Sequence, residues 1–326
     1  VINAGAATVA VTATGGAIVE ADGDVDVDIT GTTATLTATG GGIGAGNAIE
    51  TELTGVVFAA AGAVGISEVA AGTALAVQGT SGGGDISAET AAGDITLTGA
   101  VDAGAGDVVL AANGGALTGN DNLITGNALA ATAANAIGID TTVATVTAAS
   151  ATAGVDIDET DALTVGQITA ATTVVIDADA GGVAAALDGT ADVIAPTSLT
   201  VTAAGAISLE TDSPVLTFTT DDPVDATASD ITITSLDADP VAMDATTAEG
   251  SIDVTATAAL NSGTVTAGTD GDVVLTTRAG ALTLTGVTTA IGNTVALNSA
   301  AGLADTYAGG TGEAVVADTL SATAAG

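Results

Sequence analysis

Short stretches in which an apolar residue alternates with threonine recur along the whole chain, separated by segments rich in glycine, alanine and aspartate. Examples are Thr35-Leu36-Thr37, Thr96-Leu97-Thr98, Thr232-Ile233-Thr234 and Thr283-Leu284-Thr285. An alternation with a period of two places the central residue on one face of a β-strand and the threonines on the other. The pattern therefore predicts many short strands, each with one buried face.

The composition limits how thick the core can be. Only 1% of the 326 residues are aromatic, and the sequence contains no Cys, Trp or His. The apolar fraction is 47%, but much of it is Ala and Val, whose burial removes little area from water. The abundance of Val, Ile and Thr nevertheless favours folded strands over disorder. We expect a thin, all-β fold.

Internal repetition indicates an array of similar units. One block returns after a long interval with the same internal spacing, and its two copies are Gly106-Asp107-Val108-Val109-Leu110 with Gly115-Ala116-Leu117-Thr118, and Gly271-Asp272-Val273-Val274-Leu275 with Gly280-Ala281-Leu282-Thr283. Shorter periods are visible too. The pairs Ile139-Asp140, Ile157-Asp158 and Ile176-Asp177 follow one another at nearly equal intervals, and so do Val254, Leu275 and Leu297.

Periods of this length suit the coils of a solenoid. The sequence predicts an all-β fold, a right-handed parallel β-helix with roughly 18–22 residues per coil. Residues 1–326 are expected to form a single continuous rod on the order of 80 Å long, from a strand spacing of about 4.8 Å. A loop-rich stretch is expected around residues 190–245, where all four prolines lie. A tandem of β-sandwiches is the competing architecture, but it would need buried aromatic residues and more hairpin turns.

The charge of the chain restricts its partners. The net charge is −38, and Arg278 is the single basic residue. Such a chain cannot neutralise phosphates, so nucleic acid and anionic membrane surfaces are excluded as partners. Its carboxylates must be screened by dissolved salt or by bound divalent cations. The sequence therefore points to a saline or calcium-containing exterior, and calcium is the one cofactor that it suggests.

Several segments resemble the repeats of filamentous-haemagglutinin-type exoproteins. The segments are Gly93-Asp94-Ile95-Thr96-Leu97-Thr98-Gly99, the two blocks that begin at Gly106 and Gly271, Ile168-Thr169-Ala170-Ala171-Thr172 and Ala317-Asp318-Thr319-Leu320-Ser321-Ala322. The resemblance implies a secreted parallel β-helix on a bacterial surface that serves adhesion or contact. The Asn-Pro motifs of that family's secretion domain are absent, so the chain is expected to be an interior segment of a longer protein or a relative that is exported differently. The composition also resembles bacterial S-layer proteins.

Two groups of aspartates are candidate metal ligands. If Ile139, Ile157 and Ile176 stack in the core, then Asp140, Asp158 and Asp177 form a ladder about 4.8 Å apart, which calcium could bridge. The second group is the run Asp22, Asp24, Asp26 and Asp28, on one face of a strand. It does not match an EF-hand loop, because Val27 and Thr33 occupy the positions that require Gly and Glu. Solvated aspartates are the alternative explanation for both groups.

Catalysis is not expected from this set of side chains. With no His, Cys or Lys and a single Arg, only carboxylates remain for acid–base chemistry. The sequence therefore favours a non-catalytic structural or adhesive rod, extracellular and at the cell surface, that contacts a host or neighbouring cell or other copies of itself. The alternatives are a self-assembling filament, a calcium-dependent S-layer subunit, a carbohydrate-active β-helix, and an ice-binding solenoid that uses the threonine ladders.

Overall fold

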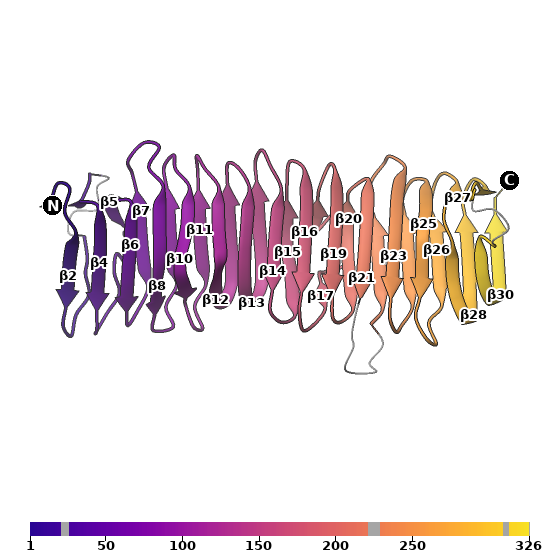
Figure 1. Cartoon of the computed structure of the whole chain (residues 1–326), viewed down its shortest axis with the longest axis horizontal. Helices are drawn as coiled ribbons and strands as arrows, with labels where there is room; N and C mark the ends of the chain where they lie inside the picture. Colours follow the sequence, from indigo (N-terminus) through magenta and orange to yellow (C-terminus); the bar gives the residue numbers. More distant parts are fainter. Residues whose placement is uncertain (21–25, 221–228, 309–312, 326) are drawn as a thin grey trace. The chain divides into compact units, whose positions relative to one another are not determined.

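The computed structural model describes the chain except for residues 21–25, 221–228, 309–312 and 326. In this part of the chain all regular secondary structure is β-strand, and the parallel strands stack as a β-solenoid of about 14 turns (Figure 1). The predicted all-β solenoid is therefore confirmed. The chain divides into two compact units, Val1–Asp158 and Glu159–Gly326, and each is described separately.

The first unit contains the strands β1 to β14. They are β1 (Ile2–Asn3), β2 (Val9–Ala13), β3 (Ile29–Thr30), β4 (Thr33–Ala38), β5 (Ile49–Glu52), β6 (Gly55–Ala60), β7 (Val64–Glu68), β8 (Leu75–Ser81), β9 (Ile86–Thr90), β10 (Ile95–Asp102), β11 (Val108–Ala112), β12 (Leu117–Ala133), β13 (Ile137–Ser150) and β14 (Val155–Glu159). Strands β2, β4, β6, β8 and β10 pair in succession, as do β1, β3, β5, β7, β9 and β11. Each coil thus adds one strand to each of two parallel stacks, and the long β12 pairs with both β10 and β11.

The second unit continues with β15 to β30. These strands are β15 (Leu163–Thr169), β16 (Thr173–Ala178), β17 (Val183–Ala184), β18 (Val193–Ile194), β19 (Ser198–Ala203), β20 (Ile207–Asp212), β21 (Val215–Thr220), β22 (Ile231–Ser235), β23 (Val241–Thr247), β24 (Ile252–Ala256), β25 (Leu260–Ala267), β26 (Val273–Thr277), β27 (Leu282–Leu284), β28 (Thr288–Ser299), β29 (Leu303–Asp305) and β30 (Val315–Ala324). The same parallel pairing recurs, for example from β20 through β22 and β24 to β26.

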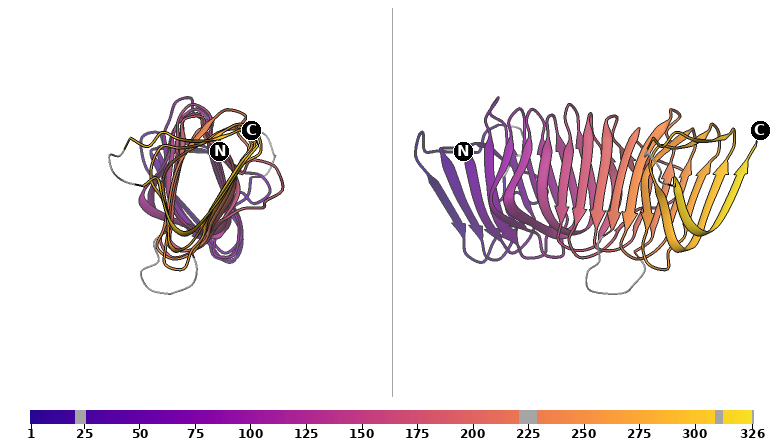
Figure 2. Two further views of the ribbon diagram at one scale, coloured as in Figure 1. Left: turned by 90° about the vertical axis from the view of Figure 1, so that its right-hand side faces the viewer. Right: turned by 45° about the vertical axis from the view of Figure 1, so that its right-hand side comes forward.

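The core is a set of aliphatic columns inside the coils. The ribbon turns back on itself in successive coils (Figure 2), and the aliphatic side chains that point to the inside of these coils are buried. In one column Leu75, Ile95, Leu117 and Ile137 occupy equivalent positions in successive coils, and all four are at most 1% exposed. The central residues of the threonine-flanked stretches, such as Leu97 and Ile233, are buried as predicted. Because each coil needs only one layer of such residues, Ala, Val and Leu suffice to fill it.

The coil length varies more than the sequence predicted. At the start of β10 one coil spans 22 residues, the separation of Ala116 from its hydrogen-bond acceptor Asp94. At β5 and β7 one coil spans only 17 residues, the separation of the paired residues Thr51 and Glu68. The coil between β1 and β3 is longer than both. The differences are absorbed in the connections, since the paired strands keep their inward-facing residues in line.

Buried hydroxyl groups form hydrogen bonds at several corners, where the chain leaves a strand. Thr90, Thr277 and Ser299 each end a strand, point inward and are at most 6% exposed. Each side-chain hydroxyl donates a hydrogen bond to the carbonyl oxygen three residues further on, at 2.6 to 2.9 Å. In each case that carbonyl belongs to a glycine. The sequence Thr/Ser-x-x-Gly therefore satisfies a polar group at the point where the chain leaves the sheet.

The stretch 190–245 is built of strands as well. It holds β18 to β22 and part of β23, with residues 221–228 outside the described part. Pro196, Pro214 and Pro240 all lie between strands, where the missing N–H breaks no ladder. The described residues include no helix long and apolar enough to cross a membrane.

Candidate metal centre

Aspartates that precede strands have a structural role that the sequence analysis did not foresee. Asp94 lies directly before β10, and its Oδ1 accepts the backbone N–H of Ala116 in the next coil, at 2.8 Å. Five further aspartates directly before strands accept an amide N–H from 18 to 22 residues later in the same way: Asp28, Asp85, Asp192, Asp230 and Asp272. Asp244, inside β23, accepts the N–H of Thr264. These acidic residues therefore connect successive coils through side-chain to backbone hydrogen bonds.

The three aspartates of the predicted ladder have different surroundings. The isoleucines beside them, Ile139, Ile157 and Ile176, are buried as predicted. Asp140 in β13 is half-buried, and burial raises its pKa, as do the charges of Asp121 and Asp156. Asp158 in β14 and Asp177 in β16 are exposed, and Asp177 belongs to the second unit. Calcium binding by these three residues stays a prediction.

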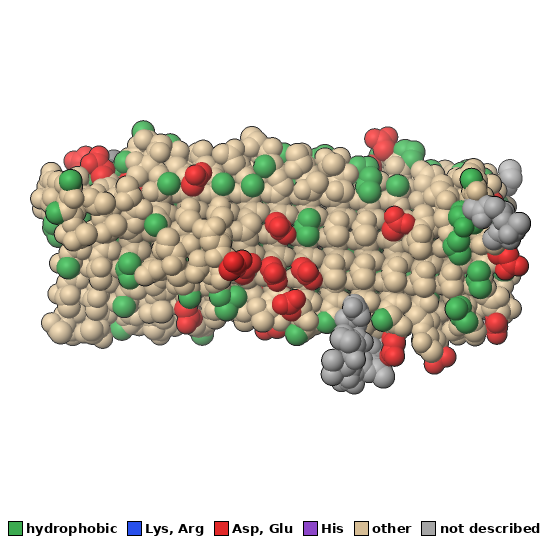
Figure 3. All heavy atoms as spheres, viewed as in Figure 1, with side chains coloured by type: hydrophobic (Ala, Val, Ile, Leu, Met, Phe, Trp, Pro, Cys, Tyr) green, Lys and Arg blue, Asp and Glu red, His purple; other side chains and the backbone are tan. Residues whose placement is uncertain are grey.

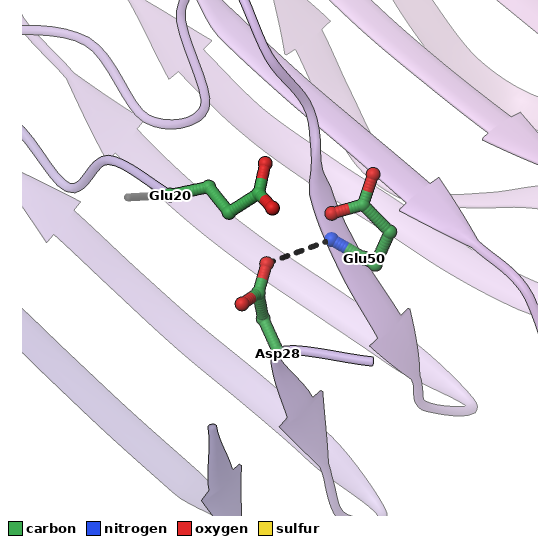
Figure 4. A group of neighbouring side chains, drawn as sticks. All are labelled: Glu20, Asp28 and Glu50. Atoms are coloured by element: carbon green, nitrogen blue, oxygen red, sulfur yellow. Dashed lines mark hydrogen bonds between the residues drawn. The ribbon is translucent and has the colours of Figure 1, made fainter. Parts of the chain in front are cut away.

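The acidic run is only partly visible. Asp22 and Asp24 lie outside the described residues, and Asp26 is exposed. Asp28 is half-buried directly before β3. Among the predicted ligands that the structure describes, Asp28 is the one whose carboxylate belongs to a close group of three, and the other two members are Glu20 and Glu50 (Figure 4).

Glu20, Asp28 and Glu50 form the acidic centre, as we call these three residues below. Each offers a carboxylate oxygen, and these three atoms all lie within 4.8 Å of one another. In the part of the chain that the structure describes, this is the one group of three His, Cys, Asp or Glu side chains that meets this spacing. The residues come from two successive coils, since Glu20 and Asp28 lie before β3, and Glu50 lies in β5.

Backbone pairing places two of these residues opposite each other. The register that pairs Ile29 with Thr51 brings Asp28 beside Glu50. The N–H of Asp28 donates to the carbonyl oxygen of Glu50 at 2.9 Å, and the N–H of Glu50 donates to Oδ2 of Asp28 at 3.4 Å. Glu20 is the third residue. It lies two positions after Ile18, which forms a parallel β-bridge with Ile43.

Glu50 is an unusual member of a strand. Ile49 and Thr51 point inward and are buried, so the alternation should leave Glu50 exposed. It is nevertheless only 7% exposed. Burial raises the pKa of Glu50 most, the charges of Glu20 and Asp28 raise it further, and a hydrogen bond from its own backbone lowers it.

Glu68 shows how this fold satisfies a buried carboxylate elsewhere. It is 0% exposed in β7. Its Oε2 accepts hydrogen bonds from Oγ1 of Thr51 at 2.8 Å and from the N–H of Leu53 at 2.7 Å, and its Oε1 accepts the N–H of Ala70 at 3.0 Å. In contrast, Oε2 of Glu50 is buried and has no hydrogen-bond partner.

An open pocket of about 150 Å³ lies beside the acidic centre. Glu20 and Asp28 form part of its wall, together with apolar residues that include Ile18, Ile29 and Ile49. Two of the three residues of the acidic centre therefore line a space that solvent can enter.

Sequence reasoning named Asp28 but missed Glu20 and Glu50. The spacing held a usable signal, because Asp28 and Glu50 are 22 residues apart, which is one coil of the predicted length. The position of Glu20 depends on a connection of irregular length. No period in the sequence indicates it.

Comparison with protein-family models gave no match, and comparisons with curated protein sequences and with solved structures gave none either. The fold and the acidic centre are therefore inferred from the sequence and structure of this chain alone.

Proposed function

We propose that this chain is a non-catalytic structural segment, an extracellular rod that acts as a stalk or adhesive fibre on a bacterial cell surface. The observation that carries the proposal is the ladder of parallel pairings within each unit, in which every coil supports the next. Such an array spans distance with few residue types. The resemblance to filamentous-haemagglutinin-type repeats agrees with this role.

The surface chemistry supports the same proposal. The sequence has no His, Cys or Lys and one Arg, so groups that commonly act as nucleophiles or bases near neutral pH are scarce. The face in Figure 3 carries several carboxylates, some of them close together, and no visible cationic side chain among the described residues. A high negative charge keeps a protein soluble and discourages non-specific contact with other anionic surfaces.

Electron microscopy of the purified chain, with and without calcium, tests the proposal. A stalk predicts separate rods on the order of 80 Å long, from a strand spacing of about 4.8 Å per coil. Long fibres or sheets would instead support the self-assembling filament or S-layer subunit. Compact globules would contradict a rod of either kind.

Ice binding is a second candidate, favoured by one specific observation in the second unit. Thr202, Thr219, Thr246, Thr266 and Thr289 occupy equivalent positions in five successive coils, and none of them is buried. Their hydroxyls are repeated at the strand spacing of about 4.8 Å, a regular array that can order water. A difference between the melting and freezing temperatures of a solution of the chain, lost in Thr246→Val with Thr266→Val, would support this function.

A further inference from the structure

The strongest unexplained feature of the molecule is the carboxylate of Glu50. Its Oε2 is buried and has no hydrogen-bond partner, although its side chain is 7% exposed and faces Glu20 and Asp28 (Figure 4). An unpaired buried carboxylate oxygen is costly, and proteins usually pair it with a donor or a metal ion. Glu68, which is satisfied by three donors, shows that this chain follows the rule elsewhere.

The chain supplies no cationic side chain to this place. Its single basic residue, Arg278, is exposed in the second unit. Three carboxylates with oxygens within 4.8 Å repel one another when ionised. A bound cation would relieve that repulsion.

The spacing and the ligand type select the cation. Two oxygens that bind the same calcium ion at about 2.4 Å each can be at most about 4.8 Å apart, which is the limit that the three carboxylates satisfy. All three ligands are oxygens, which favours a hard divalent ion. Calcium tolerates irregular geometry and bidentate carboxylates, whereas magnesium demands a near-ideal octahedron.

We propose that Glu20, Asp28 and Glu50 bind one calcium ion, which links the first coil of the chain to the second. The pocket beside Glu20 and Asp28 provides the entry path and space for the water ligands that complete the coordination. The ion holds the carboxylates of Glu20 and Asp28 against Glu50 in β5. This site goes beyond the structural role proposed above, because a rod without calcium remains a rod.

Calcium titration of the full chain by isothermal calorimetry tests the site. The wild type, Glu50→Gln and Glu52→Gln are compared at pH 7 in a constant excess of KCl, which masks diffuse attraction of ions to the acidic surface. Glu52 is the matched control, because it lies in the same strand and is exposed. We expect one saturable site per chain in the wild type and in Glu52→Gln, and at least tenfold weaker binding in Glu50→Gln.

Thermal unfolding of the same three proteins separates a metal ligand from a residue that matters only for folding. Without calcium, Glu50→Gln should melt at or above the wild-type temperature, because it removes a buried, repelled charge. Added calcium should raise the melting temperature of the wild type and Glu52→Gln and leave Glu50→Gln nearly unchanged. Equal calcium binding and equal calcium stabilisation in wild type and Glu50→Gln would overturn the site, while rods seen by microscopy would leave the structural proposal intact.

Discussion

The carboxylate of Asp94 accepts the backbone N–H of Ala116, 22 residues further along the chain, at 2.8 Å. The bond joins the start of β10 to the corner before β12, one coil later. Backbone amides at such corners lie outside the regular ladder and need a partner. An aspartate directly before a strand therefore gives the amide N–H of this corner an acceptor, beside the backbone bond from Ile95 N–H to the carbonyl oxygen of Ala116.

Replacement of Asp94 by alanine should weaken this joint locally. Loss of the bond leaves the Ala116 amide to water, and we expect a loss of about 1 kcal/mol in unfolding free energy and faster hydrogen exchange at Ala116. Asp94→Asn keeps the acceptor oxygen and should change both quantities little. Urea unfolding and hydrogen exchange measured on the two variants test this, and similar effects of Ala and Asn would mean that the charge matters instead of the hydrogen bond.

The glycine that precedes the aspartate in the recurring Gly-Asp pair is required because the coils approach each other closely there. A Cβ at Gly93 would lie 1.7 Å from the carbonyl oxygen of Thr73 in the preceding coil, so any side chain there forces the coils apart. We expect Gly93→Ala to destabilise the chain by about 3 kcal/mol or more, as an overpacked site that cannot relax. Chemical denaturation monitored by circular dichroism measures the effect.

Gly138 is the matched control for this substitution. A Cβ at Gly138 would have no atom within 4 Å, and the residue lies in the regular strand β13. Gly138→Ala should therefore be neutral or stabilising by up to about 1 kcal/mol. A comparable loss in both variants would show that the close approach of the coils at Gly93 does not determine the result.

The column of Leu75, Ile95, Leu117 and Ile137 makes each coil depend on its neighbours. Ile95 is 0% exposed and paired on both sides, so Ile95→Ala should cost about 2–5 kcal/mol. Val109→Ala, at an outward position that is 41% exposed, should change stability by less than about 0.5 kcal/mol. Thermal melts of both variants test the prediction, which a small effect at Ile95 would contradict.

The fold could be predicted because its rules are local and repeat. The alternation around Leu97 and Ile233 gives the inward face, and the recurrence of Gly106-Asp107 and Gly271-Asp272 shows that successive elements are equivalent. Both rules depend on strand geometry alone. No knowledge of distant contacts is needed.

The acidic centre depends on features that the sequence does not repeat. Asp28 and Glu50 lie side by side because they are 22 residues apart, which is the length of one coil. The repeat period of the sequence is therefore enough to pair these two residues. Glu20 reaches them through a connection that belongs to a longer coil, so the period gives no position for it. The burial of Glu50 also departs from the alternation of buried and exposed residues that is expected of a strand.

The pH dependence of stability should reveal the buried carboxylates. Burial raises the pKa of Glu68 above its ordinary value of 4.5, a nearby charge on Glu52 raises it as well, and the hydrogen bonds from Leu53, Thr51 and Ala70 oppose the rise. The folded chain then takes up this proton at a higher pH than the unfolded chain does. Linkage requires that the stability contributed by Glu68 increases as the pH falls through the folded-state pKa, and levels off below about 4.5.

Comparison with Glu68→Gln isolates this contribution from that of the other acidic residues. The variant lacks the titrating group, so its melting temperature should gain less than that of the wild type when the pH is lowered from 7 to about 4.5. Circular dichroism melts of both proteins at constant ionic strength give the difference. If the melting temperature of the wild type instead falls relative to that of Glu68→Gln on acidification, the three hydrogen bonds outweigh burial, and Glu68 is held ionised inside the solenoid.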